Sequence, residues 1–175
     1  MFTRIFAAIA LLFTSFSSLA SIDVVQRFIE QPKAVGETAR MTYLFWDVYD
    51  ATLYAPQGTY SEQQPFVLAL RYLRDLDGKA IAERSIEEMQ KQGFNDHELE
   101  KKWLQQMIAI FPDVSEDTTL YGVRNAAGYT EFYQGSNKIG EVQDPQFTRW
   151  FFDIWLGSKT SEPKLRAEIL GLGSK

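Results

Sequence analysis

The feature that most constrains the fold is a run from Thr42 to Tyr54, which is rich in β-branched and aromatic side chains. That composition favours a pleated strand. Apolar side chains occupy both odd and even positions of the run, so both faces of the strand are apolar. Such a strand has to be covered on both faces, or to enclose something between the sheet and a covering layer. The run therefore predicts a central strand in a layered protein.

A second segment predicts the covering layer, because it has a helix start, a helix stop and an apolar stripe. Asp144 is placed as the N-cap, Pro145 as the first helical residue and Gly157 as the stop. The apolar residues recur at helical spacing, and they are Phe147, Trp150, Phe151, Ile154 and Trp155. One helix face is therefore mostly aromatic, and we expect it to be buried in the core or to line a pocket.

The remaining elements fall into blocks of strands and blocks of helices. Apolar patterns and turn residues predict strands at residues 66–73, 118–123, 130–133 and 138–142, and helices at residues 78–92, at residues 95–111 with Asn95 as the N-cap, and at residues 163–170. Because strands and helices do not alternate regularly, the predicted fold class is α+β, an antiparallel β-sheet with helices layered on one side. Residues 21–30 fit a strand or a short helix equally well.

The first 20 residues read as a signal peptide. Arg4 precedes an apolar stretch over residues 5–16, and small residues stand at Ser18 and Ala20, where a signal peptidase reads the chain. We therefore expect a periplasmic protein that begins at Ser21 and forms one domain over residues 21–175, as a monomer with no stable membrane insertion after cleavage.

Composition excludes several kinds of chemistry. The sequence has no cysteine, which excludes zinc-thiolate sites and cysteine nucleophiles. Its one histidine, His97, lies in the first turn of a predicted helix, and no second histidine is present to share a metal ion. No glycine-rich phosphate motif occurs, so we expect neither a metal ion nor a cofactor. The net charge of -5 becomes -6 once Arg4 is removed, and without a Lys/Arg cluster nucleic acid is not expected as a partner.

Arg40 is the candidate anchor for a ligand, since it directly precedes the apolar strand. An arginine fork at the edge of an apolar cleft suits a carboxylate or a developing enolate. The alternative is an edge-strand arginine that pairs with Asp47 or Glu37. The hydroxyls of Tyr43, Tyr49 and Tyr72 are further candidate ligand-binding groups, and no catalytic residue is assigned.

Short motifs spread over nearly all of the chain resemble those of the chalcone isomerase-like proteins, in their exported bacterial branch. The motifs are Val35-Gly36 through Arg40, the run from Val48 to Pro56, Gly78-Lys79 at a helix start, and Trp155-Leu156-Gly157 paired with Ile169-Leu170-Gly171. The resemblance implies a large curved antiparallel β-sheet with a layer of α-helices packed on it and a ligand cleft between the layers. It also implies that Arg40 is the main polar group of that cleft.

The resemblance further implies where catalytic groups of the plant chalcone isomerases would fall in this chain. Their strand threonine falls at or near Tyr49, their helix-start tyrosine on Ile81 and their asparagine on Glu88. An isoleucine can neither orient a water molecule nor share a proton, so cyclisation of a chalcone is not expected.

Three functions stay open from the sequence. The first is binding of a small amphipathic ligand, such as a fatty acid or another apolar carboxylate. The second is an isomerase or intramolecular lyase that uses an arginine-stabilised enolate, with Tyr49 or Asp47 as the nearby acid or base. The third is a structural or partner-binding envelope protein with a filled core. A cavity would distinguish the first two functions from the third.

Overall fold

A computed structural model describes residues 24–173, so the predicted signal peptide lies outside the described residues. Residues 24–28 are helical. The strands that follow are β1 (Pro32–Ala34), β2 (Ala39–Tyr43), β3 (Trp46–Pro56), β4 (Phe66–Tyr72), β5 (Thr119–Arg124), β6 (Thr130–Gln134) and β7 (Asn137–Val142). The helices are α2 (Gly78–Lys91), α3 (His97–Ile110), α4 (Pro145–Leu156) and α5 (Pro163–Ile169).

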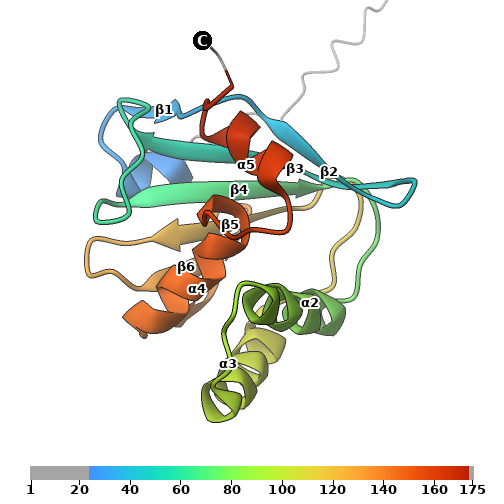
Figure 1. Ribbon diagram of the computed structural model, residues 1–175. Coiled ribbons are helices and arrows are strands. Elements are labelled where there is room, and N and C mark those ends of the chain that lie inside the picture. The colour runs from blue at the N-terminus through green and yellow to red at the C-terminus, as the bar shows by residue number, and fades with distance from the viewer. Residues whose placement is uncertain (1–23, 174–175) are drawn as a thin grey trace, which may run out of the picture.

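The strands form one antiparallel sheet of seven strands in the order β1-β3-β4-β5-β6-β7, with β2 paired to the free part of the β3 edge. Figure 1 shows α4 across one face of the sheet, with α2 and α3 beside it and α5 over β2 and β3. The predicted α+β class, an antiparallel sheet with a layer of helices, is confirmed. Among residues 24–173 no helix has the length and apolar character needed to cross a bilayer.

Both faces of β4 are buried over most of its length, as the apolar side chains on its two sides predict. Leu68 and Leu70 of β4 face the helices and belong to the main core. Val67, on the other face of β4, belongs to a second apolar cluster, where Val24 and Ile29 cover the sheet from behind. Residues 24–29 therefore cover the face of the sheet that lies opposite the helices.

The prediction of one strand over residues 42–54 is wrong, because the chain reverses at Leu44 and Phe45. β2 and β3 pair on either side of this two-residue turn, with Tyr43 opposite Trp46. Leu44 has a positive φ of 57°, a conformation that glycine and asparagine adopt more readily than leucine. A turn built from a leucine and a phenylalanine carries no turn signature, so composition alone extends the strand through it.

The N-cap of α3 also differs from the prediction by one residue. The carboxylate of Asp96, not the side chain of Asn95, accepts hydrogen bonds from the backbone N–H groups of Glu98 and Leu99. The predicted N-cap of α4 is confirmed, since the Asp144 carboxylate accepts from the backbone N–H groups of Gln146 and Phe147.

Two segments that carry part of the family resemblance lie against each other. The backbone of Gly36 approaches the end of α5 so closely that an added Cβ would sit 2.2 Å from the Glu168 carbonyl oxygen. The next residue, Glu37, donates its backbone N–H to that same oxygen at 3.0 Å. Only a glycine allows this approach. The C-terminal helix is thereby held against the segment between β1 and β2.

Candidate ligand pocket

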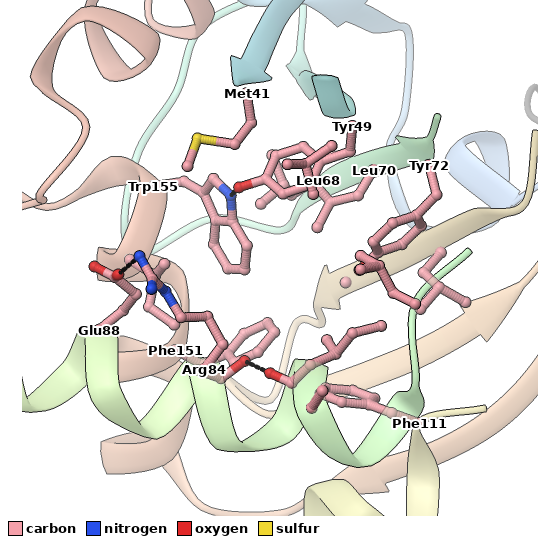
Figure 2. A pocket seen from close by; sticks show the side chains of 18 of the residues that line it. Met41, Tyr49, Leu68, Leu70, Tyr72, Arg84, Glu88, Phe111, Phe151 and Trp155 are labelled. Atoms are coloured by element: carbon pink, nitrogen blue, oxygen red, sulfur yellow. Dashed lines mark hydrogen bonds and ion pairs between the residues drawn. The ribbon is translucent and has the colours of Figure 1, made fainter. Parts of the chain in front are cut away.

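A cavity of about 290 Å³ lies between the sheet and the helices. Figure 2 shows side chains of the sheet and of the helices converging on it, among them Met41, Tyr49, Leu70, Tyr72, Phe151 and Trp155. Its walls are predominantly apolar, and its volume is near the lower end of the roughly 300–1,000 Å³ typical of small-molecule sites. The core of the described chain is therefore not completely filled.

A β-bulge shapes the sheet wall of the pocket. Met41 pairs with Tyr49 but Thr42 pairs with Asp47, so Val48 is an extra residue in β3. As a result Val48 and Tyr49, although consecutive, both line the pocket. The bulge also keeps Trp46 on the pocket side.

Two tyrosines supply hydroxyl groups to this wall. The Tyr49 hydroxyl accepts a hydrogen bond from the Trp155 indole N–H at 2.9 Å, which leaves its own proton available to another acceptor. Tyr72 packs edge-on against Tyr49, with ring centroids 5.9 Å apart. Burial raises the pKa of both hydroxyls. Both groups are therefore neutral hydrogen-bond donors at ordinary pH, and neither is suited to act as a base.

An ion pair from α2 forms part of the helical wall. The Arg84 guanidinium contacts the Glu88 carboxylate at 2.6 Å, and Lys91 contacts the same oxygen at 2.8 Å. Burial raises the pKa of Glu88, but hydrogen bonds from Lys91 and Ser161 and the charge of Arg84 outweigh it and hold that pKa below its usual value. Glu88 is therefore an ionised, fully engaged carboxylate, and Arg84 is largely neutralised by it.

Arg74 is the other cation of the pocket wall, and it differs from Arg84 in its partners. Its guanidinium carbon lies 4.9 Å from the centroid of the Trp46 ring. The Nε atom is buried and has no hydrogen-bond partner among residues 24–173. Within the same described residues no carboxylate lies within ion-pair distance of Arg74. Arg74 is thus a cation at the pocket wall whose charge no acidic side chain offsets.

Arg40, which the sequence suggests as the anchor of a ligand, is not among the residues that line this pocket. Its Nε lies 2.8 Å from one oxygen of Asp50 and its Nη1 3.0 Å from Asp47. Asp50 also binds Arg71 at 2.7 Å, which continues the ion pairs from β2 across β3 to β4. Hydrogen bonding from Arg40 holds the pKa of Asp50 below its usual value against the effect of burial. Arg40 alternates with the pocket residue Met41 along β2, so it lies on the other face of the sheet.

The structure brings three of the four predicted ligand-binding residues to the pocket, namely Tyr43, Tyr49 and Tyr72. Ile81 and Glu88, on which the resemblance implies that polar catalytic groups of the plant enzymes would fall, also line it. Sequence reasoning missed Arg74 and Arg84 as pocket cations. The available signal was that Arg84 lies one helical turn from Ile81 and Glu88, on the same face of α2.

The described residues do not include a cluster of side chains suited to bind a metal ion. The side chain of His97 is 88% exposed and contacts Glu100 of its own helix. No group of three or more potential metal ligands occurs within residues 24–173.

Comparison with known proteins identifies the fold and the family of the chain. The crystal structure of a fatty-acid binding protein of Arabidopsis thaliana superimposes with a TM-score of 0.62 over 81% of this chain and 87% of that chain, at 13% sequence identity. At that identity the likeness concerns the fold.

An uncharacterized protein of Haemophilus influenzae is 31% identical over 135 residues, which cover 76% of this chain and 65% of that protein's length. The sequence pattern of the chalcone isomerase-like family matches residues 35–171. The match spans most of the chain, from the segment before β2 to the end of α5. The chain therefore belongs to the chalcone isomerase-like family.

Proposed function

We propose that this protein binds a small amphipathic ligand with an apolar chain and an anionic head, a fatty acid being the best-supported class, and that it does so in the periplasm as a monomeric single domain of residues 21–175. The observation that carries the proposal is an apolar cavity of about 290 Å³ whose wall includes one cation, Arg74, without an acidic partner among the described residues. The family membership and the fold shared with a fatty-acid binding protein support it.

The apolar walls account for the chain of the ligand. Leu68, Leu70 and Phe151 are buried side chains that border the cavity. Burial of methylene groups against apolar walls is favourable by about 0.8 kcal/mol for each buried CH₂. A polar ligand would gain nothing from these walls and would lose its hydration. The cavity also counts against the hypothesis of a structural protein with a filled core.

Arg74 accounts for the head of the ligand. Its guanidinium has no acidic partner among residues 24–173, so a ligand carboxylate at the pocket wall would offset its charge. Charge-assisted hydrogen bonds of this kind contribute about 1.5 to 3 kcal/mol. Arg84 is less suitable, because Glu88 already contacts it at 2.6 Å. The Tyr49 hydroxyl still has a proton to donate, and it can donate it to a second polar atom of the ligand.

The test is calorimetric titration of the wild type with dodecanoate and hexadecanoate, repeated with Arg74→Gln and Arg40→Gln. Arg74→Gln is expected to weaken binding roughly 10- to 150-fold, the equivalent of about 1.5 to 3 kcal/mol. Arg40→Gln is the matched control, because Arg40 is an exposed arginine paired with Asp47 and Asp50 outside the pocket. Its affinity should stay within about twofold of the wild type.

Three results would contradict the proposal. Absence of binding by the wild type would contradict the proposal that the ligand is a fatty acid. Equal affinities of the wild type and Arg74→Gln would remove Arg74 as the anchor. A loss confined to Arg40→Gln would return the anchor to the position that the sequence first suggested.

A further inference from the structure

The turn between β2 and β3 exposes four consecutive large apolar side chains. The exposed fractions are 52% for Tyr43, 74% for Leu44, 95% for Phe45 and 62% for Trp46. Elsewhere in the described chain, the exposed large apolar side chains are Ile108 and Leu172, each alone in sequence. Single exposed apolar residues are ordinary, but a contiguous group marks a site of interaction. We call residues 43–46 the apolar turn.

Folding does not account for the identity of these residues. A two-residue hairpin turn is most stable with glycine, asparagine or aspartate at positions of positive φ. Leu44 instead holds a φ of 57°, where a leucine is strained. The apolar turn therefore carries a local cost that a polar turn of the same shape would avoid, and a binding role is a reason to retain it.

The apolar turn is continuous with the pocket. Its two flanking residues, Tyr43 and Trp46, line the cavity and are also exposed to solvent, so the cavity reaches the surface beside the turn. The guanidinium of Arg84 lies 5.4 Å from the Tyr43 ring centroid, and that of Arg74 lies 4.9 Å from the Trp46 ring centroid. A molecule that enters here passes between aromatic rings and two arginines.

The chemistry of the turn favours a lipid surface over a protein partner. Leucine and phenylalanine at the tip, flanked by a tyrosine and a tryptophan, match the order of side chains across the edge of a bilayer, where rings with a polar atom lie at the headgroups. Below the tip, Arg40 and Asp47 form an ion pair of 3.0 Å, so charges of both signs surround it. Four residues are too few for a stable protein interface, which buries about 800 Å² on each partner.

We propose that the apolar turn inserts into the surface of a lipid bilayer and thereby places the mouth of the pocket at the membrane. Leu44 and Phe45 enter the acyl boundary, while Tyr43 and Trp46 lie at the headgroups. The inference goes beyond the proposed function, because it assigns a surface rather than a ligand. Insertion rests on the apolar side chains of the turn, so it does not require anionic lipid.

The test is flotation of the purified protein with vesicles of phosphatidylcholine alone and of phosphatidylcholine with phosphatidylglycerol. The double substitution Leu44→Asn/Phe45→Ser is expected to lower the partition coefficient by at least about tenfold on both, because it removes two apolar side chains without changing charge. Asparagine tolerates the positive φ of position 44, so the variant should fold, which thermal unfolding checks. Leu172→Asn is the matched control and should bind like the wild type, because its 60% exposed leucine lies outside the turn.

A second measurement locates the contact. Vesicles with brominated acyl chains should quench part of the tryptophan fluorescence of the wild type. Trp46→Phe should remove most of that quenching, because Trp103 and Trp155 are buried and Trp150 is half-buried and lies outside the turn. Equal partition of the wild type and the double variant, or no partition of the wild type, would overturn the proposal. Dimers of the wild type in lipid-free solution that the double variant does not form would assign the turn to a second copy instead.

The outcome is separable from that of the proposed function. Titration with dodecanoate in the absence of vesicles should give the same affinity for the double variant as for the wild type. Vesicle binding without dodecanoate binding would leave the docking surface in place and remove the ligand. Dodecanoate binding without vesicle binding would support the ligand site and contradict the docking surface.

Discussion

The indole N–H of Trp155 donates a hydrogen bond of 2.9 Å to the hydroxyl oxygen of Tyr49, and this contact joins helix α4 to strand β3 over the wall of the cavity (Figure 2). The two residues are 106 positions apart in sequence. The contact fixes the orientation of both rings, and so it sets the shape of the pocket between the sheet and its covering helix. Its loss should affect stability as well as ligand fit.

Trp155→Ala is expected to lower the free energy of unfolding by about 3 to 5 kcal/mol, because it removes a buried indole that is only 7% exposed. Tyr49→Phe keeps the ring and removes only the acceptor, so it should cost about 1 to 3 kcal/mol. Denaturant titration of the two variants measures both values. A cost under about 1 kcal/mol for Trp155→Ala would mean that the α4 face is not packed as described.

Gly36→Ala should destabilise the protein by about 1 to 3 kcal/mol, because its Cβ would lie 2.2 Å from the carbonyl oxygen of Glu168. Gly173→Ala is the control, since no atom lies within 4 Å of the corresponding Cβ position. Thermal unfolding of the two variants is the measurement. Equal melting temperatures would show that α5 does not pack against the segment around Gly36.

The stability of the wild type should fall as the pH drops below about 4, in part because of Asp50. Hydrogen bonding from Arg40 lowers the pKa of Asp50 in the folded protein relative to the unfolded chain. Its contribution is thus present above the unfolded pKa and is lost as the pH falls through the folded pKa. Asp50→Asn should show a shallower decline between about pH 5 and pH 2, measured by denaturant titration.

Asp117→Asn is the control for the pH series. Its side chain is 76% exposed and its one ion pair is to Arg71, so it should retain the slope of the wild type. Identical slopes for the wild type and Asp50→Asn would mean that the ion pairs across β2, β3 and β4 do not form in solution.

The protein should not accelerate the cyclisation of a chalcone to a flavanone. Ile81 and Glu88 line the pocket, and the resemblance implies that they stand in place of a tyrosine and an asparagine of the plant enzymes. Glu88 is moreover engaged by Arg84 and Lys91. General acid-base catalysis of this kind contributes about 100- to 10,000-fold. An absorbance assay measures the rate, and turnover well above the uncatalysed reaction would favour the isomerase alternative.

We predict that the protein is exported and then begins at Ser21, because Ser18 and Ala20 provide the small residues that a signal peptidase recognises. Intact-mass measurement on protein from the cell envelope checks this expectation. Retention of the first 20 residues would contradict both the cleavage site and the expectation that no anchor remains.

The sequence predicts the elements of this fold well where the pattern is periodic and bounded. The aromatic stripe of α4 lies between Asp144 and Gly157, and the structure has this helix at Pro145–Leu156. The turn at Leu44 and Phe45 could not be predicted, because neither residue is typical of a hairpin turn and only the pairing of Tyr43 with Trp46 reveals the reversal.

The site is harder to predict than the fold, because it depends on which face of a strand each side chain takes. Arg40 precedes the apolar strand in sequence, yet Met41 points into the pocket and Arg40 points away from it. Arg74 lies in a connection between β4 and α2, where no periodic pattern exists to orient it. Its place at the pocket depends on the tertiary structure and cannot be predicted from a local sequence pattern.

The bulge at Val48 has a consequence for how a pocket of this kind can change. Deletion of that one residue would restore regular alternation in β3, which would turn Trp46 outward and Asp47 toward the cavity. The loss of a single codon would thus have the effect of several simultaneous substitutions at the pocket entrance. An aromatic side chain there would be replaced by an acidic one. The bulge is a point at which one genetic step can alter the charge of the molecules that such a pocket admits.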